Sequence, residues 1–170
     1  ASPQIGRQEI AAVEEVLLSG QYVSGRKVDE FETLFSEYVG VDYSVAVNSG
    51  TAALHSALDV LGVGPGDEVI VPALTFFSTV TAVVHQAGVP IFCDISLDNF
   101  CLDPDDLLRR ITPRTKAIIA VHYFGHAAEM DAINQIAKRY GLAVIEDCAQ
   151  AHGTTYKGRK VGSLGDMGAY

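Results

Sequence analysis

Short apolar runs alternate with segments of helical periodicity along most of this chain, and this alternation limits the possible folds more than any other feature. The runs are rich in Val, Ile and Ala, and they lie at Glu68–Val71, Ile91–Cys93, Ala117–Val121 and Ala143–Glu146. Strands that are apolar on both faces and are separated by helices are typical of a parallel sheet with helices on both sides. We therefore expect an α/β fold with a mostly parallel central sheet.

Apolar residues recur at helical spacing between these runs and predict helices there, and glycine marks several of the predicted helix ends. A further strand is expected from Tyr43 to Val47, because β-branched and aromatic residues alternate there with smaller ones. The predicted helices are one ending at Gly20, one ending at Gly40, one after Gly50, one through Ala82 to Ala87, one starting at Asp103-Pro104 and one from Met130 to Tyr140.

Polar and aromatic residues follow the predicted strands, at the positions where open parallel sheets bind their ligands. They supply backbone N–H groups, aromatic rings, a carboxylate and an amide, which together suit a flat, phosphorylated heteroaromatic ring. These segments are Asn48–Thr51, Pro72–Phe77, Asp94, His122–Tyr123 and Asp147–His152.

The Ser49-Gly50-Thr51 turn has two interpretations. It is either a helix cap, in which a hydroxyl satisfies free N–H groups, or a phosphate-binding turn in which Gly50 lets the backbone approach an anion. The chain contains neither G-x-x-x-x-G-K nor G-x-G-x-x-G, so the usual nucleoside triphosphate and dinucleotide motifs are missing.

A purely structural role is also possible for three other candidates, Phe76, Phe77 and Asp147. One phenylalanine of the pair is expected in the core, and the other is a candidate to lie on a cofactor ring. Asp147 ends an apolar run, where a buried carboxylate needs a partner; a protonated ring nitrogen is one candidate, and a helix cap or an ion pair is the other.

Cysteine and histidine give no catalytic or metal-binding pattern. Cys148 lies near His152 in sequence, but a small buried residue is the better interpretation of this cysteine. His122 and His126 lack further residues at ligand spacing, so we predict no metal site.

Charge and hydropathy exclude several classes of partner. The chain has 12 Lys and Arg against 21 Asp and Glu, a net charge of -9, which disfavours binding to nucleic acid or to an anionic membrane surface. No apolar run is long enough for a membrane span, and the first twenty residues include Arg7, Glu9, Glu14 and Glu15 where a signal peptide would have an apolar core. We expect a cytoplasmic protein.

Several longer stretches carry a resemblance to a known family. "NSGTAALHSAL", "GPGDEVIVPALTFFSTVTAV", "VIEDCAQAHG" and "GSLGDMGAY" occur in an order that resembles the DegT/DnrJ/EryC1/StrS group. Its members are aminotransferases that use pyridoxal 5'-phosphate (PLP) to act on sugar nucleotides and cyclitols. The resemblance implies the fold-type I, aspartate aminotransferase-like architecture.

The resemblance also implies a role for individual residues. Gly50 and Thr51 would bind the PLP phosphate, and Phe76 would stack on the pyridine ring. Asp147 would pair with the pyridinium nitrogen and act as the catalytic carboxylate in this chain, and Gln150 would reach the ring hydroxyl side. The substrates implied are glutamate or glutamine as amino donor and a keto-sugar nucleotide or keto-cyclitol as acceptor, in a homodimer.

One departure from the family pattern concerns the Schiff-base lysine, which in the family follows the G-D-x-G segment. None of the lysines of this chain, Lys27, Lys116, Lys138, Lys157 and Lys160, matches that position. We therefore expect the N-terminal portion of a longer enzyme, inactive by itself, with a helical segment over residues 1–40 and part of the large PLP domain over 41–170. A sugar dehydratase of the same family and a non-catalytic PLP or sugar-nucleotide binding module are the alternatives.

Overall fold

The computed structural model describes residues 3–170 and divides them into two units, one up to Ala46 and one from Val47 to Tyr170. The first unit holds helices α1 (Arg7–Ser19) and α2 (Arg26–Val39). Both end where predicted, because Gly20 and Gly40 adopt left-handed backbone with φ of 72° and 87°. The predicted domain division, with its boundary at residue 40, stays a prediction.

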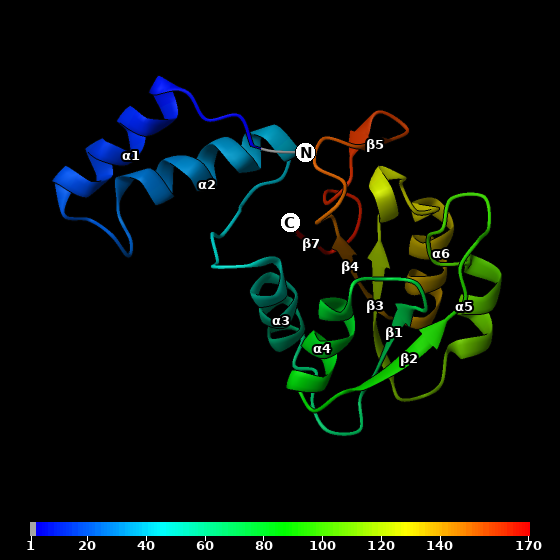
Figure 1. The fold of residues 1–170 in the computed structure, drawn as a ribbon. Coiled ribbons are helices and arrows are strands. Elements are labelled where there is room, and N and C mark those ends of the chain that lie inside the picture. Colours follow the sequence, from blue (N-terminus) through cyan, green and yellow to red (C-terminus); the bar gives the residue numbers. More distant parts are fainter. Residues whose placement is uncertain (1–2) are drawn as a thin grey trace. The chain divides into compact units, whose positions relative to one another are not determined.

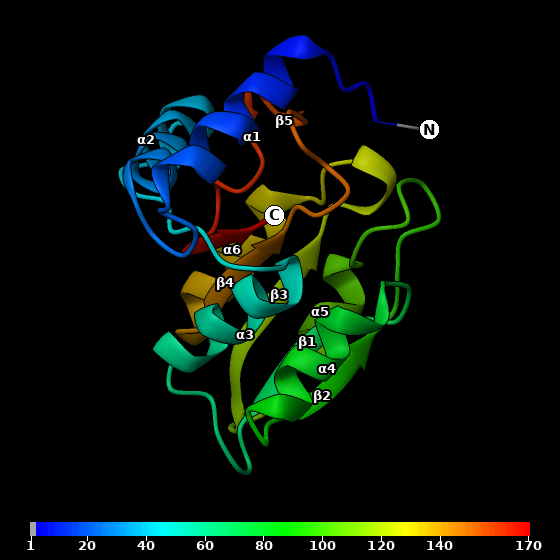
Figure 2. The ribbon, with the colours of Figure 1, turned by 60° about the vertical axis from the view of Figure 1, so that its left-hand side comes forward.

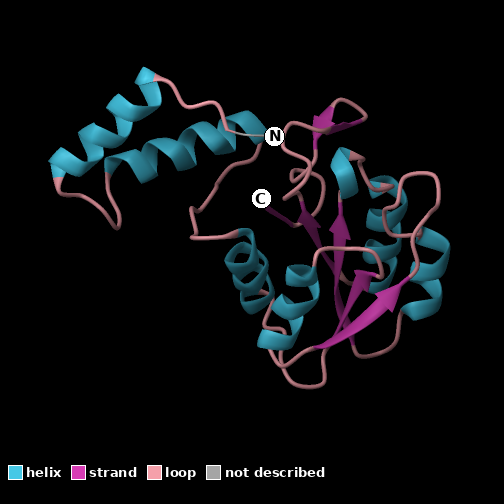
Figure 3. Ribbon diagram, in the orientation of Figure 1, coloured by secondary structure: helices cyan, strands magenta, loops and turns pink. Residues whose placement is uncertain are grey.

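The second unit is built on a five-stranded sheet with the strand order β2-β1-β3-β4-β7. All four neighbouring pairs are parallel, which confirms the predicted α/β class. Figures 1 and 3 show these strands between helices. The strands are β1 (Glu68–Pro72), β2 (Val89–Cys93), β3 (Thr115–Val121), β4 (Ala143–Asp147) and β7 (Met167–Ala169), and β5 (Thr155–Tyr156) and β6 (Arg159–Lys160) form a separate hairpin.

Helices cover both faces of the sheet. Figure 1 shows α3 (Gly50–Val60) and α4 (Phe77–His85) on one side, and α5 (Pro104–Arg110) and α6 (Met130–Tyr140) on the other. Figure 2 shows the same layers from a second direction. A short 3₁₀ turn, η1 (Tyr123–Gly125), follows β3. None of the helices in the described part of the chain is long and apolar enough to cross a membrane.

Each face of the sheet has its own apolar core, because successive side chains of a strand point to opposite faces. On the α3 and α4 face, Leu58 packs with Val69, Ile119 and Ile145. On the α5 and α6 face, the core includes Ile70, Leu107, Ile118, Ile133 and Val144. The strands are therefore apolar on both sides, as their sequence predicts.

The strand expected from Tyr43 to Val47 is not formed. The segment is drawn as a loop in Figure 3, and its polar contacts are made to α2: the backbone N–H of Ala46 donates to Glu32 Oε1 at 2.7 Å. A strand requires a neighbour that completes its backbone hydrogen bonds, and within the described residues this segment has none. Its alternating composition alone was therefore misleading.

The helix expected through Ala87 is also shorter than predicted, since α4 ends at His85. Ala87 has a left-handed backbone with φ of 57°, and the N–H of Gly88 turns back to the Val83 carbonyl at 3.1 Å. The other helix starts and ends agree with the sequence, including the Asp103 cap, whose carboxylate accepts from Asp105 N–H at 3.0 Å.

Replacing Leu58 by alanine is expected to destabilise the protein by about 2–5 kcal/mol, because it leaves a cavity under α3 where Leu58 is fully buried. The matched control is Val60→Ala, a residue on the same helix that is 79% exposed, and it should change stability by less than about 0.5 kcal/mol. Urea denaturation measures both values, and equal effects would contradict the assignment of this core.

Candidate active site

Asp147 is the last residue of β4 and is almost completely buried, with 7% of its surface exposed. The Thr79 hydroxyl of α4 donates to Oδ2 at 2.9 Å, and the Ala149 N–H donates to Oδ1 at 3.2 Å. Burial raises the pKa of Asp147 above its ordinary value, although both hydrogen bonds act in the opposite direction. The carboxylate is thus held in place by neutral donors, with no cation paired to it among the described residues.

The start of α3 combines a cap with free donors. The Ser49 hydroxyl accepts the Ala52 N–H at 3.1 Å, and the Ser49 carbonyl accepts the Ala53 N–H at 3.0 Å, which confirms the capping interpretation. Within the described part of the chain, the N–H groups of Gly50 and Thr51 have no acceptor. The cap therefore leaves two N–H groups at a helix start available for an anion.

Gly50 makes a close backbone approach to the end of the sheet. A Cβ atom at this position would lie 3.3 Å from the carbonyl oxygen of Tyr170, closer than side chains ordinarily pack. Tyr170 directly follows β7, so this contact places the start of α3 at the carboxyl end of the sheet.

Phe76 precedes the first residue of α4, four residues after the end of β1. Its side chain is 60% exposed, and that of Phe77 is 66% exposed, so the expectation that one of the two packs in the core is wrong. Their ring centroids are 4.6 Å apart. The pair instead forms an exposed aromatic surface at the start of α4, beyond the carboxyl end of β1.

Gln150 lies in the turn that follows β4 and is exposed. Its Oε1 accepts the backbone N–H of Phe124 at 3.0 Å, which links this turn to the η1 turn after β3. The contact uses the amide oxygen and leaves the amide NH₂ group as a donor for a ligand.

The residues predicted as a site lie at one edge of the sheet, and Asp147 and the starts of α3 and α4 also share one face. Asp147 points toward the α3 and α4 layer, because it contacts Thr79 there. The starts of α3 and α4, with Gly50, Thr51 and Phe76, lie at the same carboxyl edge. Gln150 follows β4 at that edge. The structure therefore brings the predicted residues to one region; their roles toward a cofactor stay predictions.

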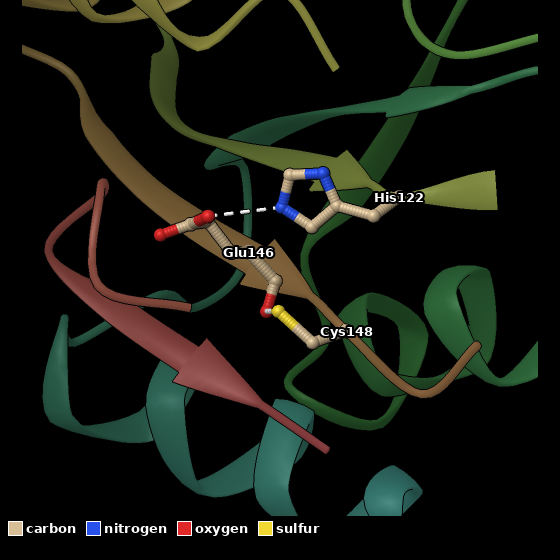
Figure 4. Close-up of side chains that lie close together, drawn as sticks. All are labelled: His122, Glu146 and Cys148. Carbon is tan, nitrogen blue, oxygen red and sulfur yellow. Dashed lines mark hydrogen bonds and ion pairs between the residues drawn. The ribbon is translucent and has the colours of Figure 1, made fainter. Parts of the chain in front are cut away.

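Sequence reasoning missed the role of Glu146, which is fully buried on the opposite face of β4. Figure 4 shows its carboxylate beside His122, whose Nε2 lies 2.9 Å from Oε2. His122 Nδ1 accepts the Ala128 N–H at 3.0 Å, so Nε2 carries the proton and donates to Glu146. Backbone N–H groups of Gly162, Leu164 and Gly165 donate to the same carboxylate at 2.8, 2.6 and 2.7 Å.

These contacts make Glu146 an acceptor that fixes a later part of the chain. Burial raises the pKa of Glu146, but the donors from His122 and from residues 162, 164 and 165 outweigh it and hold the pKa below its ordinary value. The segment from Gly162 to Gly165, which leads into β7, is thereby anchored to β4. The signal available in the sequence was the second acidic residue of an otherwise apolar strand.

Cys148 completes a buried group with His122 and Glu146 (Figure 4). Ligand atoms of these three residues lie within 4.8 Å of one another. The Nε2 proton and both carboxylate oxygens are already engaged in the hydrogen bonds described above, which leaves no pair of free ligand atoms for a cation. Burial raises the pKa of the Cys148 thiol and so disfavours the thiolate, and the prediction of a buried cysteine is confirmed.

A parallel sheet covered on both faces, with its polar groups at the carboxyl edge, is the architecture of fold-type I PLP enzymes, and the similar solved structures are aminotransferases of that class. The chain belongs to the DegT/DnrJ/EryC1/StrS aminotransferase family, whose sequence model matches residues 3–170. The predicted family membership and fold are confirmed.

Individual relatives agree with this assignment. The chain is 48% identical over 168 residues to the spore coat polysaccharide biosynthesis protein SpsC of Bacillus subtilis (strain 168), covering 99% of this chain and 43% of SpsC. The aminotransferase from Psychrobacter cryohalolentis superimposes with a TM-score of 0.95 at 42% identity, over 99% of this chain and 43% of its own. DesV of S. venezuelae, solved in complex with a ketimine intermediate, gives a TM-score of 0.89 at 46% identity, over 90% of this chain and 41% of its own.

Replacing Glu146 by glutamine is expected to lower the free energy of unfolding at pH 7 by about 1–3 kcal/mol, because the amide NH₂ group faces N–H donors that then lack an acceptor. The lowered pKa of Glu146 sets the pH dependence. The ionised Glu146 carboxylate stabilises the fold fully above its ordinary pKa of 4.5, and this stabilisation is lost as the pH falls through the lower pKa of the folded state. The difference in free energy of unfolding between wild type and Glu146→Gln should therefore narrow below about pH 4.5.

Denaturation at pH 7, 5 and 4 tests this expectation, with Glu37→Gln as the control for loss of an exposed carboxylate on α2. A difference between wild type and Glu146→Gln that stays constant across this range would show that ionisation of Glu146 contributes nothing.

Proposed function

We propose that this chain is part of a PLP-dependent enzyme that transfers an amino group from glutamate or glutamine to a keto-sugar nucleotide or keto-cyclitol. The chain spans about two fifths of the relatives it matches, so the activity is proposed for the whole protein. The observation that carries the proposal is the buried Asp147 carboxylate at the same edge and face as two N–H groups of a helix start that have no acceptor in the described chain.

The residues present fit the phosphate of PLP. Gly50 and Thr51 offer N–H groups at the positive end of the α3 dipole, and the Thr51 hydroxyl has no partner in the described residues. The Ser49 cap occupies the next two N–H groups, so the anion and the cap use different donors of the same turn. Capping and phosphate binding are therefore compatible.

The residues also fit the ring of PLP. Asp147 has no cationic partner in the part of the chain that the structure describes, and a protonated ring nitrogen is the partner that would compensate its burial. Phe76 offers an exposed ring face to the pyridine, and Gln150 offers its amide NH₂ group on the side of the ring hydroxyl. When bound, PLP supplies an electron sink for a substrate carbanion, and a proton held at its ring nitrogen by Asp147 strengthens that effect.

We place the Schiff-base lysine of the whole protein outside these residues. Lys116, near the start of β3, donates to the Gly62 carbonyl at 2.6 Å and to Asp67 at 3.1 Å, and both partners precede β1. It therefore lies at the amino edge of the sheet, opposite the candidate site. Lys157 forms an ion pair with Asp131, and Lys27 pairs with Glu15 and Glu30.

The substrates and assembly are proposed from the family. SpsC is named for polysaccharide biosynthesis, which supports a sugar-linked acceptor. We also propose a homodimer in the cytoplasm. The whole protein, incubated with PLP, L-glutamate and a keto-sugar nucleotide, should yield 2-oxoglutarate and an amino sugar, both measured by mass spectrometry. A deoxygenated sugar without nitrogen would instead indicate the dehydratase, and PLP binding without turnover would indicate a binding module.

Replacing Asp147 by asparagine is expected to separate stability from cofactor binding. Because the pKa of Asp147 is raised in the fold, its ionised form costs stability at any pH above the ordinary value of 3.8, and a neutral side chain removes that cost. The amide NH₂ group can face the Thr79 hydroxyl, which accepts as well as donates, so no donor is left without an acceptor and the PLP-free protein should melt no lower than wild type. PLP should bind roughly 100-fold more weakly, because the ring nitrogen loses its charged partner.

Thermal melting without PLP and titration with PLP followed by visible absorbance measure the two effects. Asp59→Asn, an exposed carboxylate on α3, is the control and should leave both values unchanged. Wild-type affinity for PLP in Asp147→Asn would contradict the proposed role of this residue.

A further inference from the structure

We infer that Thr79 is the positioning residue of Asp147: its hydroxyl, itself held by the Thr75 hydroxyl, orients the carboxylate as an acceptor so that the proton stays on the cofactor's ring nitrogen. The inference rests on the proposed function and deepens it, because it assigns a residue that acts on the cofactor only through Asp147. Thr79 lies outside the segments predicted to form the site, and Thr75 lies in the predicted segment Pro72–Phe77 but was given no role there.

The geometry consists of two consecutive hydrogen bonds. Thr79 lies in the first turn of α4 and is fully buried, and its Oγ1 is 2.9 Å from Asp147 Oδ2. Thr75 lies in the loop between β1 and α4, and its Oγ1 is 2.8 Å from Thr79 Oγ1. The chain of contacts therefore runs from the loop before Phe76 to the end of β4.

The direction of these hydrogen bonds follows from counting protons. A hydroxyl has one proton, and an ionised carboxylate can only accept. While Asp147 is ionised, Thr79 must donate to Oδ2, and the only role left to it toward Thr75 is that of acceptor. Thr75 then donates to Thr79. The Ala149 N–H is a fixed donor to the other oxygen, so both oxygens of Asp147 face donors.

This arrangement opposes the effect of burial on the proton. In a buried pair of a carboxylate and a pyridine nitrogen, a low dielectric favours the neutral form, in which the proton moves to the acid. A hydrogen bond donated to the carboxylate stabilises its ionised form and so favours the proton on the nitrogen. Thr79 is the only side chain in the described residues that makes such a bond to Asp147.

The test uses the whole protein loaded with PLP that carries ¹⁵N in the pyridine ring, because the chemical shift of that nitrogen reports directly whether it is protonated. Thr79→Val keeps the shape of the side chain and removes its hydroxyl, and Thr79→Ser keeps the hydroxyl. Thr81→Val is the matched control on the same helix, since the Thr81 hydroxyl donates to the Ser78 carbonyl and not to Asp147.

The expected result is a shift typical of a protonated nitrogen in wild type, Thr79→Ser and Thr81→Val, and a displacement toward the unprotonated value in Thr79→Val. PLP should also bind about 10-fold more weakly to Thr79→Val, from the loss of a hydrogen bond to a charged group. Thr75→Val, which removes the donor to Thr79, should shift the signal in the same direction by a smaller amount.

The outcomes separate this inference from the proposed function. If wild type does not bind PLP, the proposed function fails. If wild type binds PLP and Thr79→Val gives the same nitrogen shift, only the role of Thr79 is overturned, and a lowered melting temperature would then mark it as structural. If Thr79→Val does not fold, Thr75→Val decides the question, and an unchanged shift in that variant overturns the inference.

Discussion

Two adjacent carboxylates at the end of one strand determine how this unit is organised, because each must be buried and each faces a different layer. Glu146 receives four hydrogen bonds from the protein itself, three of them from the backbone. Asp147 receives two, and no cation among residues 3–170 pairs with it. Burial acts on both, yet the pKa of Glu146 is lowered and that of Asp147 is raised. The difference follows the number of donors: four hydrogen bonds offset the burial of Glu146, whereas two do not offset the burial of Asp147.

The surrounding elements serve these two acids separately. On one face, α4 supplies the hydroxyl that contacts Asp147, and the start of α3 lies at the same edge with two N–H groups that have no acceptor among the described residues. On the other face, His122 and the backbone from Gly162 to Gly165 surround Glu146, so the residues before β7 are fixed by an interaction that has no part in the candidate site. The network of Glu146 and the candidate site around Asp147 thus lie on opposite sides of β4.

Much of this was predictable where the signal is local. The glycines at 20, 40 and 141 mark helix ends because left-handed backbone is needed at each of them, and Ser49 caps α3 through a contact three residues away. The strand expected at Tyr43–Val47 failed because pairing depends on a neighbour that composition does not reveal. The network of Glu146 was not predictable either, since its backbone donors lie 16 to 19 residues further along and carry no side-chain signature.

The alternation of side chains along β4 limits which mutations this strand can accept. Val144 and Ile145 lie in different cores, and the two acids continue the same alternation. A single-residue insertion or deletion within β4 would send each carboxylate into the other layer. Point substitutions and longer loops do not change which face each residue of β4 points to. The apolar residues of β4 can therefore be exchanged for others, but the number of residues in the strand cannot change. A chimaera of two relatives must likewise keep each residue of β4 on its original face of the sheet.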